Sequence, residues 1–531
     1  MSAPTASEPR RGLLKKRGVR SGAEHPEPRA QAERGGTSGP GGPRPASKAG
    51  ELARRGEVRP IPLAVSIVLG VAIWLVPTPN GLEDNAWHLF AIFFATIVAI
   101  IVKAAPMGSL SVVAIALCAG TQVLAPGDTG ESISAALSGF SNSTIWLIVS
   151  AFFVARAVVK SGLGLRLAYL FVRLFGRSTL GLAYGLGLTD LALSPFIPSN
   201  TARAGGIVYP ITKSICESSG SLSEDPSTHR KIGSYLALTG YNMDLAVSVI
   251  FLTGAAPNAM AVQLAMEQGV SLTWTGWFLA AAVPGIIGVI LVPLILYFTH
   301  APEVKKTPEA PRQAAEKLKE LGGITRPEWI TLAVFVLIIA LWIFGTDILN
   351  ATTVAFIGLA ALLLGGALTW EDMKSEKAAW DTLVWFAALV MMGTYLNTTG
   401  FIGWFGDGVG GWMADQGMSK MLAFVALTAV YALSHYLFAS GTAHAASMFA
   451  VFLAVGLALG LPGVPLVVFL GAIPTIMGCL THYGNGPAPI YYGSGYVELK
   501  AWWLNGLLIG AMHLVVWLVI GTVWWNVIGV W

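Results

Sequence analysis

Long apolar segments follow one another from residue 61 to the end of the chain, and short polar segments separate them. An α-helix needs about 20 apolar residues to cross the hydrocarbon core of a bilayer. By this length we predict eleven membrane-spanning segments. They cover 61–77, 86–103, 108–124, 144–160, 233–265, 275–299, 328–346, 350–368, 381–398, 466–497 and 501–529. The pattern therefore predicts an all-α polytopic membrane protein.

Two further apolar stretches, 179–212 and 421–457, are each interrupted near the middle by small polar residues. Each stretch is long enough for two half-length helices that meet at a tip. We interpret them as re-entrant hairpins, which enter and leave the membrane on the same side. The predicted fold is therefore about 11 transmembrane helices plus two re-entrant hairpins.

The distribution of Lys and Arg tests this count, because cytoplasmic loops of membrane proteins are enriched in both. With the N-terminus in the cytoplasm, the predicted inner segments carry nearly all of the basic residues, and Lys420 is the exception on the outer side. The predicted outer loops without Lys or Arg are 78–85, 125–143, 266–274, 346–349 and 458–465. A wrong hairpin count would reverse the side of every later loop, so the charge pattern supports this topology.

The two hairpins lie in matching sequence contexts. The first tip reads Pro-Ser-Asn-Thr-Ala-Arg at 198–203, and the second reads Ala-Ser-Gly-Thr-Ala-His at 439–444. The spans that precede the two hairpins cross in opposite directions, so the repeats are inverted. We place the first repeat at 60–300 and the second at 328–531, joined by a cytoplasmic linker at 301–327.

Each repeat contains a second interruption, which falls inside a predicted span. These segments, 253–258 and 481–489, are rich in Gly, Pro and Asn. Proline removes a backbone donor and breaks a helical hydrogen bond, so freed amides and carbonyls can face a ligand. Inverted repeats with discontinuous helices place a binding site near the membrane midplane. We therefore expect both tips and both interruptions to meet at one site.

Hydroxyls, amides and helix N-termini in these four segments suit a carboxylate, because a helix N-terminus attracts anions. The tips approach from opposite sides, so a ligand with two carboxylates can engage both. The candidate substrate-binding residues are Ser199, Asn200, Thr201, Ser440, Gly441, Thr442, Pro257, Asn258, Gly486 and Pro487. The substrate class that we expect is a small di- or tricarboxylate.

Arg203 and His444 occupy equivalent positions, four residues after the tip serines. A charge at membrane depth is costly and usually functional. Both residues are therefore candidates for charge compensation, either against the bound anion or in the place of a bound cation. In the structural alternative, Arg203 extends to the cytoplasmic surface and His444 is a neutral packing residue. The sequence leaves both interpretations open.

Four other polar residues lie in or near apolar segments, and for each we favour a structural role over a proton relay. They are Asp190, Asp244, His435 and His482.

Composition indicates a membrane protein with a separate N-terminal tail. Hydrophobic residues make up 54% of the 531 residues and charged residues 12%, against about 25% charged residues in soluble domains. Residues 1–59 hold 13 Lys and Arg against six Glu and show no apolar periodicity. We predict a disordered basic cytoplasmic tail there, and its Glu content argues against a plastid transit peptide. Because the basic excess is confined to the tail, it does not indicate nucleic-acid binding.

Other function classes find little support. Common catalytic motifs such as GxSxG, HExxH and Walker A do not occur in a fitting context, so we predict that the protein is not an enzyme. The three cysteines, Cys118, Cys216 and Cys479, lack metal-ligand spacing. A channel is the other alternative, but inverted hairpins favour an occluded, alternating site over a continuous pore.

Three stretches resemble the divalent anion/sodium symporter family, and in particular its plastidic 2-oxoglutarate/malate translocators and bacterial citrate/succinate exchangers. They are PSNTARAGG at 198–206, KIGSYL at 231–236 and LTHYGNGPAPIYYGSGYV at 480–497. The resemblance covers about residues 60–531. It implies a scaffold domain and a transport domain, an elevator motion, a homodimer, and a di- or tricarboxylate substrate such as 2-oxoglutarate, malate or succinate. We expect a bacterial plasma membrane, with the plastid inner envelope as the alternative.

The resemblance also implies two Na⁺ sites in sodium-coupled members, which would fall at Ser199, Asn200 and Gly254 and at Ser440 and Gly484. This sequence departs from that pattern. Its second tip has Gly441 where an Asn would supply an amide oxygen, and Arg203 and His444 stand where sodium-coupled members carry small residues. We therefore expect anion exchange without a cofactor, and Na⁺-coupled symport is the alternative.

Overall fold

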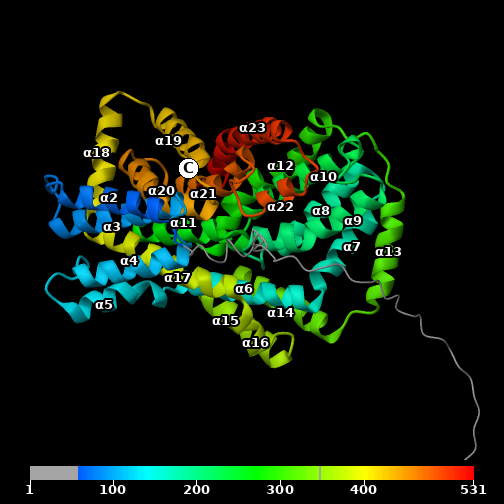
Figure 1. The fold of residues 1–531 in the computed structure, drawn as a ribbon, viewed down its shortest axis with the longest axis horizontal. Helices are drawn as coiled ribbons and strands as arrows, with labels where there is room; N and C mark the ends of the chain where they lie inside the picture. Colours follow the sequence, from blue (N-terminus) through cyan, green and yellow to red (C-terminus); the bar gives the residue numbers. More distant parts are fainter. Residues whose placement is uncertain (1–57, 346–347) are drawn as a thin grey trace, which may run out of the picture. The chain divides into compact units, whose positions relative to one another are not determined.

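The structure, a computed structural model, describes residues 58–345 and 348–531 and is built from α-helices (Figure 1). The predicted tail at 1–59 lies outside the described residues, apart from its last two positions. Within those two ranges, the chain has no strand and only one isolated antiparallel bridge, between Ser178 and Lys306. The predicted all-α class is confirmed.

Most of the predicted spans are single helices. In the described part of the chain, nine helices are long and apolar enough to cross a membrane, and four apolar helices are shorter. The unbroken helices are α2 Pro60–Leu75, α3 Asp84–Ile101, α4 Met107–Thr121, α6 Ser143–Ser161, α12 Trp274–Thr299, α14 Arg326–Phe344, α15 Ala351–Gly365 and α17 Lys377–Thr398. The last predicted span runs from α23 Leu499–Val515 through η7 Val516–Gly521 into α24 Thr522–Val527.

Both predicted hairpins consist of two helices joined at a short tip. In the first hairpin, α8 Thr179–Leu193 is followed by η2 Thr201–Val208, a π-helical segment, and α9 Tyr209–Ser218. In the second, α19 Lys420–Ser434 and η5 His435–Leu437 lead to α20 Gly441–Ala458. The tips therefore fall at the polar interruptions read from the sequence.

Both predicted span interruptions are also present. The first separates α10 Gly233–Ser248 and η4 Leu252–Gly254 from α11 Ala256–Glu267. The second separates α21 Gly463–Ile476 and η6 Met477–Leu480 from α22 Ala488–Gly493. Proline stands at the start of both α11 and α22, a position where its missing N–H is tolerated.

Several helices lie in segments that the sequence analysis treated as loops or linker. They are α5 Thr129–Leu137, η1 Ser138–Ser141, α7 Leu163–Phe175, η3 Pro226–Thr228, α13 Glu309–Leu321, α16 Trp370–Ser375 and α18 Phe401–Asp415. These helices are shorter than a membrane span, so a span-length criterion does not detect them. The predicted linker thus carries α13, which packs against α7.

The helices pack in two groups. In the first, which we name the α17 group, α17 packs against α4 and α6, and α6 packs against α15. In the second, the hairpin group, α20 packs against α11, α18 and α21, and α10 packs against α8 and α12. Figure 1 shows the two groups side by side. Because α11 contacts both α17 and α20, the first interruption lies at the boundary between the groups.

Candidate binding site

One cavity of about 180 Å³ lies where both hairpin tips and both interruptions meet. The predicted convergence of these four segments is therefore present in the fold. Helices α6 and α17 close the cavity from the side of the α17 group. The lining residues are Phe152, Pro198, Ser199, Asn200, Thr201, Ala255, Ala256, Pro257, Thr382, Trp385, Ser440, Thr442, Thr475, Asn485 and Gly486.

No Lys, Arg, His, Asp or Glu lines this cavity. Its polar groups are hydroxyls, amides and the starts of helices. Asn200 caps η2 through the Thr201 N–H, which donates to Oδ1 at 2.9 Å, and Ser440 is the N-cap of α20. The helix α11 begins at the same wall, after Ala255. Helix N-termini carry a partial positive charge, so this neutral cavity still favours an anion.

The first tip and the second interruption are joined directly. The Asn200 Nδ2 donates to the Asn485 Oδ1 at 3.0 Å, and the Gly486 N–H donates to the same oxygen at 2.8 Å. A Cβ on Gly486 would lie 2.0 Å from the Thr201 Oγ1. The backbone of the interruption thus approaches the tip so closely that only glycine fits without displacing the threonine hydroxyl.

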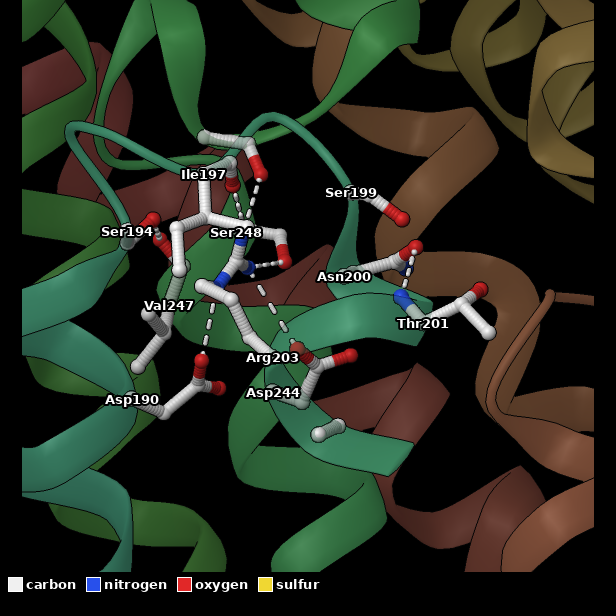
Figure 2. Close-up of polar contacts among 12 residues, drawn as sticks. Asp190, Ser194, Ile197, Ser199, Asn200, Thr201, Arg203, Asp244, Val247 and Ser248 are labelled. Atoms are coloured by element: carbon white, nitrogen blue, oxygen red, sulfur yellow. Dashed lines mark hydrogen bonds and ion pairs between the residues drawn. The ribbon is translucent and has the colours of Figure 1, made fainter. Parts of the chain in front are cut away.

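Arg203 is completely buried one turn behind the first tip and does not line the cavity. Figure 2 shows its side chain among Asp190, Asp244 and Ser248. Its Nε donates to the Asp190 Oδ1 at 2.7 Å, and one Nη donates to the Asp244 Oδ1 at 3.4 Å. The guanidinium also donates to the Ser248 hydroxyl and to the carbonyl of Ile197. Arg203 therefore does not extend to a surface, as the structural alternative would require.

The carbonyl of Gly254, which the resemblance assigned to a cation site, accepts a hydrogen bond from Arg203 at 2.7 Å. Two backbone carbonyls, from Ile197 and Gly254, thus point at the guanidinium. Carbonyl oxygens pointing at one place suit a cation, and here a fixed guanidinium takes that place.

His444 lies at the corresponding position behind the second tip and is also completely buried. Its Nδ1 is 3.1 Å from the Nδ1 of His435, and its Nε2 is 2.9 Å from the Ser434 Oγ. The His435 Nε2 donates to the carbonyl of Gly484 at 3.0 Å. The Gly484 oxygen, the other predicted cation ligand, therefore also faces a protein donor.

Three candidate residues shape the site without lining it. Asn258 donates to the carbonyls of Ser248 and Phe251, at 2.8 and 2.9 Å, and so stabilises the first interruption. Gly441 lies against the Pro474 carbonyl, and Pro487 precedes α22. Of the four polar residues given a structural role, Asp190, Asp244 and His435 contact Arg203 or His444. His482 accepts a hydrogen bond from the Trp503 indole at 3.3 Å.

The sequence analysis missed the wall formed by α6, α17 and α21, which supplies Phe152, Thr382, Trp385 and Thr475. The hydroxyl of Thr475 is buried and has no hydrogen-bond partner among the described residues. These residues lie inside apolar spans, so nothing in their local sequence marks them.

A model of the sodium:sulfate symporter transmembrane region matches residues 58–531. The chain belongs to this family. The predicted resemblance is confirmed, and the protein is an integral membrane transporter and not an enzyme.

Relatives within the sodium:sulfate symporter family match nearly the whole chain. YflS of Bacillus subtilis, which is named for malate transport, is 47% identical over 91% of this chain and 99% of its own length. The chloroplastic dicarboxylate transporter 1 of Spinacia oleracea is 44% identical over 88% and 82%. The citrate/succinate antiporter of Escherichia coli K12 is 37% identical over 88% and 98%.

The solved structure of the YdaH transporter from Alcanivorax borkumensis has a TM-score of 0.56 to this chain, over 76% of this chain and 90% of that one. Its sequence identity is 14%, so it supports the fold alone.

Proposed function

We propose that this family member transports small dicarboxylates across a bacterial plasma membrane by exchanging one anion for another. The observation that carries the proposal is the neutral cavity of about 180 Å³ between two hairpin tips. Uncommitted hydroxyls and helix N-termini approach it from opposite sides, which suits a compact anion with a carboxylate at each end. The names of the relatives, which include a dicarboxylate transporter and a citrate/succinate antiporter, point to the same substrate class.

The size of the cavity favours the smaller members of this class. Pockets for drug-sized ligands are about 300–1,000 Å³, whereas this one is about 180 Å³. Malate, succinate and 2-oxoglutarate are the substrates that we propose, ahead of the bulkier citrate.

The Arg203 contacts support exchange without Na⁺ coupling. Na⁺ binds to oxygen ligands, and the Gly254 carbonyl expected to bind it already accepts a hydrogen bond from the guanidinium. The guanidinium is itself paired with Asp190 and Asp244, so it fills this position without leaving an excess positive charge at the tip. With the position filled by the protein, transport would not need Na⁺, and the citrate/succinate antiporter among the relatives supports exchange.

The histidine pair supports the same proposal at the second tip. The Gly484 carbonyl, which the resemblance assigned to the other cation site, accepts a hydrogen bond from the His435 Nε2 at 3.0 Å. The oxygen expected to bind Na⁺ at the second tip therefore also faces a protein donor.

We further propose an elevator motion in a homodimer. The cavity lies between the α17 group and the hairpin group, so a shift of one group past the other would move the site across the membrane. The motion and the dimer are implied by the family resemblance.

The substrate class is tested by counterflow in proteoliposomes preloaded with unlabelled malate. Labelled malate should accumulate transiently, and external succinate and 2-oxoglutarate should compete more strongly than citrate. Sulfate as the strongest competitor, or no accumulation of any dicarboxylate, would contradict the proposed substrate class.

A further inference from the structure

A second cavity, of about 380 Å³, lies next to the binding site and shares Ser440 with it. We name this cavity the vestibule. One side is formed by the tip of the second hairpin, including Phe438 and Ala443, and the other by the ends of α2, α3 and α4. The second tip therefore separates the vestibule from the binding site, with Ser440 exposed to both.

Two exposed cations, Arg59 and Lys103, line the vestibule. Neither forms a salt bridge or a side-chain hydrogen bond with any described residue. The Arg59 backbone N–H donates to the Ala104 carbonyl at 2.7 Å, which fixes the start of α2 beside the turn after α3. Two like charges are thus placed at one cavity without a described carboxylate between them.

Lys103 adopts a left-handed backbone conformation, with φ of 53°. The Ala104 N–H donates to the Ala99 carbonyl, and the Lys103 N–H donates to the Ile100 carbonyl. This is the Schellman pattern that ends a right-handed α-helix with one residue in the left-handed conformation. Glycine normally occupies this position, because a side chain costs about 1 kcal/mol there. A lysine in place of glycine at this strained backbone position indicates a functional role for the lysine side chain.

The start of α4 adds a third feature that favours anions. Pro106 and Met107 line the vestibule, and no side chain caps this helix. Asp381 lies beside Gly108 in the first turn of α4 and forms no salt bridge with either vestibule cation. The remaining walls include apolar residues such as Phe438, and low-dielectric walls focus the field of like charges that line a cleft.

We propose that the vestibule is a cytoplasmic loading site for the transported dianion, with Arg59 and Lys103 as its binding residues. The proposal rests on the proposed function and adds a second anion site to it. Our topology puts Lys103 on the cytoplasmic side, and the second hairpin enters from the outer side, so its tip faces the cytoplasm. A dicarboxylate arriving from the cytoplasm would meet the two cations first and Ser440 next.

The test is the double variant Arg59→Gln/Lys103→Gln, assayed in proteoliposomes whose orientation is known. We expect the KM for malate at the cytoplasmic face to rise roughly three- to tenfold, and to depend less on salt than in the wild type. The maximal exchange rate and the KM at the outer face should stay unchanged. The matched control is Arg173→Gln, an exposed cation on α7 that we also place on the cytoplasmic side, and it should leave both KM values unchanged.

An unchanged cytoplasmic KM in a well-folded double variant would overturn the loading site. The comparison is repeated in vesicles of phosphatidylcholine alone and of phosphatidylcholine with phosphatidylglycerol. An effect seen only with phosphatidylglycerol would assign the two cations to lipid phosphates and would also overturn the proposal. Dicarboxylate exchange by the wild-type protein is measured before any variant is compared. A wild-type protein that exchanges no dicarboxylate would contradict the proposed function itself.

Discussion

Arg203 shows how one buried side chain can fix the behaviour of a binding site that it does not touch. Its guanidinium donates to two carboxylates, one hydroxyl and two backbone carbonyls, all within the first repeat. A lysine has three donors on one atom and cannot span this set. The residue is therefore suited both to hold the tip in place and to occupy a cation position.

We predict that Arg203→Gln lowers malate exchange at least about tenfold and that Arg203→Lys retains part of it. Removing one partner from a buried ion pair costs about 3–5 kcal/mol, so the Gln variant should also unfold at a lower temperature. Exchange is measured by counterflow and stability by thermal unfolding in detergent. Wild-type exchange by a folded Arg203→Gln protein would show that the cation is dispensable.

Trp385 is the clearest candidate ligand contact that the sequence analysis missed. It is largely buried and lines the cavity, and neither its indole N–H nor the Thr382 hydroxyl has a hydrogen-bond partner among the described residues. We predict that Trp385→Phe, which keeps an aromatic ring and removes the N–H donor, raises the KM for malate about tenfold. This is the effect expected when one hydrogen bond to a charged group is lost. Trp329→Phe, at an exposed Trp on α14, is the control. Equal KM values for both variants would exclude this contact.

Gly486 gives a prediction that follows from space alone. Because an added Cβ would lie 2.0 Å from the Thr201 Oγ1, Gly486→Ala must displace a stiff, β-branched side chain in the site. We expect exchange to fall severalfold while the protein remains folded. Gly206→Ala, at a glycine with open space around it, should exchange normally. The two variants are compared by initial rates at equal amounts of reconstituted protein.

The helical elements that form the site could be predicted because their sequence pattern breaks twice in each repeat. An apolar run with a polar centre has few solutions in a membrane, since backbone groups exposed to lipid would lack partners. The hairpins at 179–212 and 421–457 therefore followed from the pattern. The convergence of the two tips and the two interruptions at one cavity could be predicted from the inverted repeat. No single segment would have indicated it.

Other elements could not be predicted by the same argument. The short helices α7, α13 and α18 are too short for a span-length criterion to detect, although α7 and α13 are amphipathic, and their positions depend on tertiary contacts. The buried ion pair between Arg166 on α7 and Glu328 on α14, at 2.7 Å, is one such contact. The partners of Arg203 were also unpredictable, because Asp190 and Asp244 belong to different helices and only the fold brings them together.

The link between α6 and α16 gives a prediction about pH. Although partial burial opposes it, hydrogen bonds from Lys160 and Thr369 lower the pKa of Asp372 from 3.8 to about 2. A carboxylate with a depressed pKa stabilises the fold above its unfolded-state pKa and loses this effect as the pH falls through its folded-state value. Asp372→Asn should therefore lower the unfolding temperature slightly at pH 7, and the difference from wild type should shrink between pH 4 and pH 2. A difference that does not change with pH would contradict this ionic role.

At the scale of the whole molecule, the two helix groups and the paired tips describe a carrier with one small site at their boundary. Protein donors face the carbonyls behind both tips, Arg203 at Gly254 and His435 at Gly484, where sodium-coupled relatives are expected to bind Na⁺. The arrangement accounts for a site that accepts a dianion although no charged side chain lines it. It also accounts for transport without Na⁺ coupling, because the protein itself fills the position expected for a cation at the first tip.

The most direct test of this account is uptake of labelled malate into proteoliposomes, with and without internal dicarboxylate and with and without an inward Na⁺ gradient. We predict uptake only into vesicles that contain an internal dicarboxylate, at the same rate in Na⁺ and in choline. Uptake into empty vesicles that follows the Na⁺ gradient would contradict the account. Arg203 and His444 would then be packing residues in a sodium-coupled symporter.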